Sequence, residues 1–204
     1  MSASRPGLAL VPVLVMVLGL TLSAETAETA ETAVAQTQSM PWLLDKTHSQ
    51  LEFSGTQTGS GFTGTFSRYE AHIDFDPAQP QTGHIDLTVD LGSARTGDTQ
   101  RDTALPGKDW FDIASFPKAH FVSTAIRRTG ANTYQADGSL TLRNVSRPVR
   151  LDFMLSVDGQ TAHAKGHADL MRTQFGVGQG PWASGQWVGL PVVVTFDFMA
   201  RRAG

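Results

Sequence analysis

The sequence predicts an all-β domain that closes into an eight-stranded antiparallel barrel. Three observations favour this fold. Apolar and polar residues alternate through most of the chain between Met40 and Gly204, as in strands with one dry and one wet face. Turn signals such as Asp158-Gly159 separate the alternating runs. The runs reach about a dozen residues, whereas strands of a two-layer sandwich, the alternative architecture, typically have about five or six.

The alternating runs define the predicted strands in chain order. In the third run, for example, Ile85, Leu87 and Val89 alternate with Asp86 and Thr88. We place the eight strands near residues 48–56, 62–75, 84–91, 119–127, 133–143, 148–157, 161–171 and 187–199. Each strand is therefore expected to turn one face to the interior of the barrel.

The segment from Thr96 to Ser115 lacks this alternation. Its apolar residues Leu105, Trp110 and Phe111 predict short helical turns, so we expect a short helical connection between strands three and four. Because it is the longest connection of the domain, it is expected to cover a barrel mouth or edge.

The inward positions carry both large and small side chains. An eight-stranded barrel is just wide enough to be filled by its side chains or to hold one slender ligand. Many inward positions are small and are expected to leave volume unfilled: Gly55, Gly64, Ala71, Ala125, Ala136, Gly138, Ala162, Ala164, Gly166 and Ala168. The pattern alone is compatible with either an apolar tunnel or a solid core.

We predict from strand parity which residues line and bind a ligand in such a tunnel. They are Phe53, Phe66, Ile73, Phe75, Leu87, Val89, Phe121, Leu142, Phe153, Leu155, Phe175, Trp182, Val194 and Phe196. Because side chains alternate between the two faces of a strand, a single β-bulge would invert the assignment downstream of it.

The composition excludes several classes of function. The formal net charge of −3 and the pI near 6.0 provide no basic field of the kind that nucleic acid selects. The chain has no cysteine, which removes disulfides, thiolate metal sites, cysteine nucleophiles and covalent c-type haem. We therefore expect no nucleic-acid partner and no covalent cofactor.

The histidines do not form a convincing catalytic or metal site. His163 and His167 would stand about 13 Å apart on a strand, which is too far to bind one metal ion. His72 and His84 lie on wet strand faces among acidic residues, where a solvated surface is favoured over a weak cation site. The glycine-rich segment 175–180 lacks the Lys-Ser/Thr pair of a phosphate loop. The sequence thus predicts a protein that is not an enzyme and has no metal site.

The N-terminal residues predict a secretory signal peptide over 1–23. Their apolar run is nearer to 15 residues than to the roughly 20 of a membrane-spanning helix. A second match to a cleavage site ends at Ala35, and an uncleaved anchor is the alternative. Residues 24–39 form an Ala/Glu/Thr spacer, and the barrel domain is expected over 40–204.

Spaced motifs over essentially the whole domain resemble the YceI-like family. The motifs are Trp42-x-x-Asp45-x-x-His48-Ser49-x-Leu51-x-Phe53, Gly64-x-Phe66, Phe75-Asp76-Pro77, Thr96-Gly97-x-x-x-Arg101-Asp102, Trp110-Phe111-Asp112, Phe116-Pro117-x-Ala119-x-Phe121, Gly138-x-Leu140-Thr141-Leu142-Arg143-x-Val145-x-x-Pro148-Val149 and Arg172-x-x-Phe175-Gly176-Val177-Gly178. They span Met40 to Met199 in the expected order.

The resemblance implies a lipocalin-like barrel that is exported to the periplasm. It further implies that the lumen holds a polyisoprenoid lipid or an isoprenoid quinone, and that the protein carries this lipid. Family members occur fused to, or encoded beside, membrane b-type cytochromes, so such a cytochrome is an expected partner, and a homodimer is an open expectation. The alternative function is that of a stress-related interaction protein with a filled barrel and no role in lipid transport.

Four positions in or near the family motifs carry more specific expectations. Arg101 and Asp102 are expected to cap and brace the long connection, and Arg172 to pair with a carboxylate or to meet a polar head group. Pro191 departs from the family pattern. Because proline cannot donate a ladder hydrogen bond, the last strand is expected to start or bulge there.

Overall fold

The computed structural model describes residues 41–203, so the predicted signal peptide and spacer lie outside the described residues. The described strands are β1 (Pro41–Leu44), β2 (Gln50–Gln57), β3 (Ser60–Phe66), β4 (Tyr69–Asp74), β5 (His84–Asp90), β6 (Ala94–Arg95), β7 (Lys118–Arg128), β8 (Thr133–Leu142), β9 (Val145–Asp158), β10 (Thr161–Met171) and β11 (Pro191–Arg202). The described helices are α1 (Thr99–Ala104) and the 3₁₀ turns η1 (Lys46–His48), η2 (Pro80–Thr82), η3 (Leu91–Ser93), η4 (Arg172–Phe175) and η5 (Gly180–Trp182).

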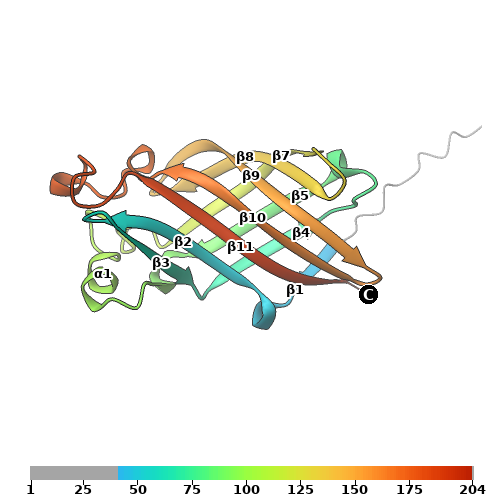
Figure 1. The fold of residues 1–204 in the computed structure, drawn as a ribbon, viewed down its shortest axis with the longest axis horizontal. Coiled ribbons are helices and arrows are strands. Elements are labelled where there is room, and N and C mark those ends of the chain that lie inside the picture. The colour runs from blue at the N-terminus through green and yellow to red at the C-terminus, as the bar shows by residue number, and fades with distance from the viewer. Residues whose placement is uncertain (1–40, 204) are drawn as a thin grey trace, which may run out of the picture. The chain divides into compact units, whose positions relative to one another are not determined.

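Eight of the strands form a closed antiparallel ring (Figure 1). Its order is β1, β4, β5, β7, β8, β9, β10 and β11, and it closes because β1 pairs with both β4 and β11. The long strand β11 pairs with β1 near its C-terminal end and with β2 nearer its start. The predicted all-β, eight-stranded antiparallel barrel is therefore confirmed.

Two features of the ring were not predicted. The predicted run 62–75 is divided at Arg68, whose N–H donates to the Ser93 hydroxyl (3.1 Å) and whose carbonyl accepts from the Asp90 N–H (3.0 Å). The alternation also changes phase at this point, because Ser67 and Arg68 are both exposed between the buried Phe66 and Tyr69, and the pairing partner changes from β2 to β5. The four-residue strand β1 was missed, because so short an apolar segment shows no clear alternation.

The last strand follows the expectation for Pro191. It starts at this proline and not at residue 187, and it continues to Arg202. Because proline cannot donate a hydrogen bond to a neighbouring strand, the first position of a strand is one of the few that it tolerates.

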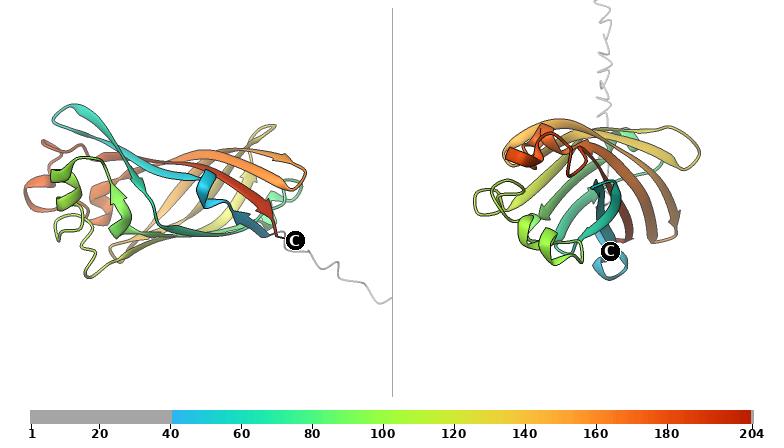
Figure 2. Two further views of the ribbon diagram at one scale, coloured as in Figure 1. Left: turned by 90° about the horizontal axis from the view of Figure 1, so that it is seen from below. Right: turned by 60° about the vertical axis from the view of Figure 1, so that its left-hand side comes forward.

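The two ends of the barrel have different connections (Figure 2). We call one the loop end, where α1 and residues 172–190 lie, and the other the turn end, where the β9–β10 turn and the C-terminal end of β11 lie. The helix α1 lies in the connection between β5 and β7, as predicted for strands three and four. It lies at the loop end of the barrel.

The connection that contains α1 is held by polar side chains. Asp102 accepts hydrogen bonds from the N–H and the hydroxyl of Thr96, both at 2.7 Å. Arg101 donates to the Gln57 amide oxygen of β2 (3.0 Å) and lies 4.9 Å from the centre of the Phe62 ring. These two residues brace the connection as expected, whereas the cap at the start of α1 is Asp98.

A β-bulge in β7 changes one inward assignment. The register of β7 against β8 shifts between Ser123 and Ala125. Ser123 is buried and its hydroxyl accepts from the Ile85 N–H at 2.8 Å, whereas Ala125 is exposed. The prediction that Ala125 points inward was therefore wrong, since the extra residue inverts side-chain parity.

Among residues 41–203, no helix is long and apolar enough to cross a membrane.

Candidate functional site

An apolar cavity of about 240 Å³ lies inside the barrel. Strands from all around the ring contribute to its lining, together with residues of the connections at the loop end. Thirteen of the fourteen residues predicted to line a tunnel lie along this cavity: Phe53, Phe66, Ile73, Phe75, Leu87, Val89, Phe121, Leu142, Phe153, Leu155, Phe175, Val194 and Phe196. That these residues contact a ligand stays a prediction.

Trp182 lies outside the cavity lining. It is half-buried in η5, and its ring centre lies 5.6 Å from that of Trp110. The segment 172–190 contains no strand, so strand parity could not have determined where this side chain points.

Several lining residues were missed by the prediction. Trp42 and Leu44 come from the unpredicted strand β1, and Leu105, Trp110 and Phe111 come from the connection that contains α1. The last three had a usable signal, because apolar residues in a segment expected to cover a barrel mouth must pack against the interior.

The small inward residues fall into two groups. Ala71, Ala162, Ala164 and Ala168 line the cavity and leave space as expected. Gly55 also lines it, although an added Cβ there would lie 3.1 Å from the Phe62 Cζ atom, whereas Ala136 is fully buried and lies outside the lining. The other group consists of Gly64, Gly138 and Gly166. A Cβ added to Gly64 would lie 2.4 Å from the Phe53 Cζ atom, and one added to Gly138 would lie 2.4 Å from the Phe121 Cζ atom. A Cβ added to Gly166 would lie 2.6 Å from the Phe196 Cζ atom.

Phenylalanine rings therefore cover these three glycines, and the expectation that they leave volume unfilled was wrong. A ring that lies against a cross-strand glycine stays close to the barrel wall. A larger residue at the glycine would push the ring away from the wall. The glycines thus keep the rings out of the middle of the lumen.

Arg172 is buried at the loop end of the cavity, with 4% of its surface exposed. Its Nε donates to the Gly189 carbonyl (2.8 Å), and its two Nη atoms donate to four further carbonyls, those of Val177, Gly178, Trp182 and Val188. A guanidinium has five N–H donors, so all of them are used by the backbone.

This arrangement differs from both expectations for Arg172. Its partners are backbone carbonyls and not a carboxylate, and none of its N–H donors is left for a polar head group. Burial lowers the pKa of its guanidinium. The ring of Trp110 lies 5.4 Å from the guanidinium carbon and covers it. Arg172 therefore holds the connection 172–190 in place over the cavity.

Aromatic side chains close the turn end of the cavity. The Trp42 indole N–H donates to the Phe75 carbonyl at 2.9 Å. The rings of Tyr134 and Phe153 are stacked with centres 5.5 Å apart, and Phe75 meets Tyr134 edge to face at 5.3 Å. These rings are buried. They belong to strands, except that of Phe75, which directly follows β4, so this end is part of the barrel core.

Comparison with known proteins identifies the family of this barrel. The model of the YceI-like domain matches residues 42–200. The chain belongs to the YceI-like family. The resemblance seen in its sequence motifs is therefore confirmed.

Relatives of this YceI-like chain include bacterial proteins of similar length. A UPF0312 protein of Pseudomonas syringae pv. tomato is 29% identical over 190 residues, which cover 89% of this chain and 97% of the relative. The crystal structure of BcnA from Burkholderia cenocepacia has a TM-score of 0.74 and 30% identity, and covers 77% of this chain and 99% of BcnA. A polyisoprenoid binding domain from Saccharophagus degradans, 15% identical, shares the fold with a TM-score of 0.62 over 80% of this chain and 99% of that domain.

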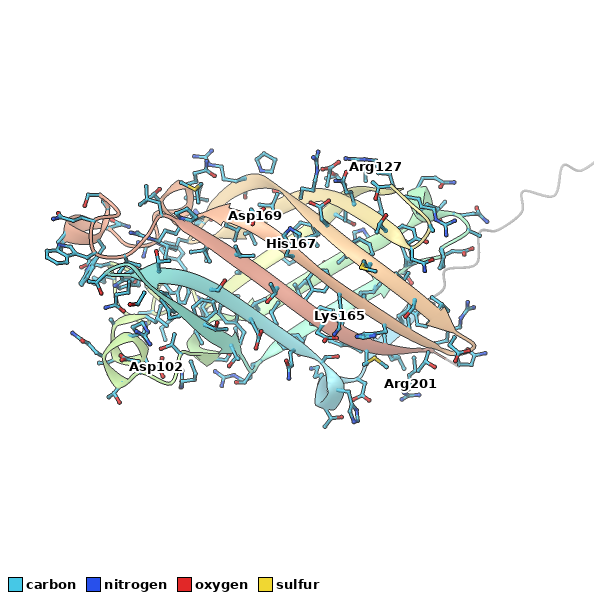
Figure 3. The ribbon with its side chains drawn as sticks, viewed as in Figure 1. Asp102, Arg127, Lys165, His167, Asp169 and Arg201 are labelled. Atoms are coloured by element: carbon cyan, nitrogen blue, oxygen red, sulfur yellow. The ribbon has the colours of Figure 1, made fainter. Side chains whose placement is uncertain are left out.

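The outer face of this YceI-like barrel carries its charged residues. Lys165, His167 and Asp169 are exposed on β10, where they alternate with the small inward residues (Figure 3). On the same face, Asp197 of β11 accepts from Lys165 (2.8 Å) and contacts the His163 ring nitrogen (2.6 Å). Among the described residues, no group of three or more His, Asp or Glu is arranged to hold a metal ion.

Proposed function

We propose that this protein binds a polyisoprenoid lipid or an isoprenoid quinone in the barrel cavity without a covalent bond. In this proposal it acts in the periplasm, after export, as a carrier and not as an enzyme. The observation that carries the proposal is the apolar cavity, whose lining includes Arg172 and His120 as its sole charged or titratable side chains among the described residues. Both side chains already have partners, because His120 is bound to Asp86 at 2.8 Å.

The shape of the lining suits an isoprenoid chain. The alanines of β10 leave room for the methyl branches of the chain, and the phenylalanine rings supply contact area around it. Each methylene buried in such an environment contributes about 0.8 kcal/mol to binding. A polar or charged ligand would lose its hydrogen bonds to water and find no free partner in the lining.

The comparisons support the proposal at the level of the family and the fold. A solved structure with this fold is a polyisoprenoid binding domain, and the chain is a YceI-like protein. The cavity counts against the alternative of a stress-related interaction protein with a filled barrel. A membrane b-type cytochrome as partner and a homodimer stay predictions.

Solvent extraction of the purified protein, followed by mass spectrometry, tests the proposal. We expect a prenyl lipid in the wild type and a strong reduction in Ala164→Leu, because the larger side chain fills the cavity. His167→Leu is the matched control, since this residue of the same strand is exposed on the outer face and should retain the lipid. No prenyl lipid in the wild type, together with no uptake of added ubiquinone, would overturn the proposal.

A further inference from the structure

We propose that the ligand enters and leaves the cavity through a side portal between β3 and α1, and that Arg101 holds this portal closed. The side portal is the boundary between residues 60–64 of β3 and the helix α1. The inference rests on the proposed function, because it concerns the route of the same ligand. Two observations carry it: an unpaired strand edge, and the small number of contacts that hold the helix beside this edge.

The strand ladder of the barrel is interrupted at β3. On one side, β3 pairs with β2 along almost its whole length. On the other side, it pairs with β6 through its last two residues, so residues 60–64 have no strand partner there in the described chain. Helix α1 lies beside this edge, since Arg101 reaches Gln57 of β2 and the ring of Phe62 in β3 (Figure 1). A helix and not a strand therefore borders β3 at this point.

Arg101 joins α1 to the β2–β3 hairpin. Its guanidinium donates to the Gln57 amide oxygen at 3.0 Å and lies over the Phe62 ring. None of the residues of α1 is buried. The other hydrogen bonds of α1 in the described chain stay within its own connection, as between Asp102 and Thr96. These internal bonds let the helix move as one unit when Arg101 is released.

The later part of the same connection is fixed more firmly. The Asp109 carbonyl accepts from the N–H groups of Gly178 and Gln179, at 2.7 and 2.8 Å. Arg143, in the β8–β9 turn, donates to the Lys108 carbonyl at 2.7 Å. Residues 108–110 are thus bonded to two other connections, whereas α1 is bonded to the hairpin through one side chain.

The segment 172–190 is also fixed to its surroundings. The Thr58 N–H donates to the Trp187 carbonyl at 2.8 Å. The Gly189 N–H donates to the Thr56 carbonyl at the same distance. The five bonds of Arg172 to backbone carbonyls add to these contacts. Local opening occurs where the fewest contacts must break, so α1 is the part of the loop end that opens most readily.

The cavity lies next to α1. Leu105, the residue that directly follows the helix, lines the cavity, and so does Phe62. Release of Arg101 from the Phe62 ring would therefore open a path past these two apolar side chains. A lipid chain could follow this path while the strands keep their ladder hydrogen bonds.

Stopped-flow kinetics of a fluorescent ligand test the inference. The probe is farnesyl anthranilate, whose anthraniloyl group accepts energy from Trp42 and Trp110 of the cavity lining. In Arg101→Gln, we expect the association and dissociation rates each to rise about fivefold, the size of one lost hydrogen bond, with an unchanged dissociation constant. A residue that binds the ligand itself would change the dissociation constant. Arg201→Gln, at an exposed position of β11, is the matched control and should leave both rates unchanged.

A covalent tie across the portal provides a second test. The chain has no cysteine, so a short bismaleimide reacts with the introduced pair Gln57→Cys and Arg101→Cys alone. Cross-linking after loading should slow release of the probe by more than about tenfold, because the helix can no longer move away from the hairpin. The control pair, Thr58→Cys and Trp187→Cys, ties two segments that are already bonded and should leave release unchanged. Thermal unfolding checks that every variant is folded.

Three results would overturn the inference: unchanged rates in Arg101→Gln, unchanged release after the cross-link between positions 57 and 101, or equal slowing by both cross-links. In each case, binding of the probe by the wild type at equilibrium would show that the proposed function survives. If the wild type does not bind the probe, the proposed function fails and the inference fails with it.

Discussion

The two ends of this barrel are closed by different means. At the turn end, side chains of the strands and of the residues next to them close the cavity, with Phe75, Tyr134 and Phe153 packed on one another. At the loop end, the connections that contain α1 and residues 172–190 cover it, and one buried guanidinium joins five backbone carbonyls there. Closure by strands is part of the global fold, whereas closure by connections can be released locally.

From this difference we expect the proposed ligand to enter at the loop end. Opening the turn end would require the strands to separate, which costs much of the stability of the domain. Opening the loop end requires movement of connections alone, whose residues make fewer ladder hydrogen bonds. The barrel thus combines a fixed end with an end that can open, and the following predictions test that combination.

The largest expected effect is the loss of a ring at the turn end. Phe153→Ala should lower the free energy of unfolding by about 4 kcal/mol, since a buried ring is replaced by a void. Urea unfolding measures it, and hydrogen exchange should accelerate in all strands of the ring. Met154→Ala, at an exposed position of the same strand, is the control. A loss under about 1 kcal/mol would show that the turn end is not part of the global core.

A smaller and more local effect is expected at the loop end. Arg172→Lys leaves at least two of the five carbonyls without a donor and should cost about 2–3 kcal/mol. Hydrogen exchange should accelerate over residues 172–190 and far less in the strands. Arg147→Lys, exposed on β9, serves for comparison. Uniform acceleration across the barrel would contradict the local nature of this closure.

The smallest effect is expected on the stability of the fold at acid pH. Asp45 follows β1, and hydrogen bonds from the side chains of Thr47 and His48 lower its carboxyl pKa from 3.8 to about 2. Because its pKa in the unfolded chain is higher, ionised Asp45 stabilises the fold above about pH 4, and this contribution is lost as the pH falls toward 2. Asp45→Asn should flatten the stability curve in that range, measured by urea unfolding at several pH values.

The control for the acid experiment is Asp158→Asn at the exposed end of β9, next to the β9–β10 turn. Its curve should keep the shape of the wild-type curve. If Asp45→Asn leaves the acid-induced loss as steep as before, the ionised carboxylate of Asp45 does not stabilise the fold in this pH range.

Much of the fold could be predicted because its signal is local. The alternation of Ile85, Leu87 and Val89 is sufficient to predict β5 and its inward face, and Pro191 correctly predicts the start of the last strand. Each rests on the geometry of one residue and its immediate neighbours. The predicted lining holds for the residues that strands carry and for Phe175 of η4, but not for Trp182 of η5, which no strand orients.

Other features depend on contacts between distant residues. The bulge that turns Ala125 outward arises in the pairing of β7 with β8, and alternation along β7 alone does not reveal it. The ring of Phe196 on β11 covers Gly166 on the neighbouring strand β10, so it fills the space that the small size of this glycine predicts to be empty. The partners of Arg172 are carbonyls of residues 177–189, which no motif identifies.

The sequence by itself determined most of the strands, the barrel, the family and most of the apolar lining, because side-chain parity is fixed by the backbone of each strand. The tertiary structure alone decided how the barrel closes through β1, which glycines are covered by rings, and how a buried arginine secures the loop end. These features follow from pairing and packing between residues far apart in the chain. No local pattern encodes them, since their free energy is gained only when the barrel has formed.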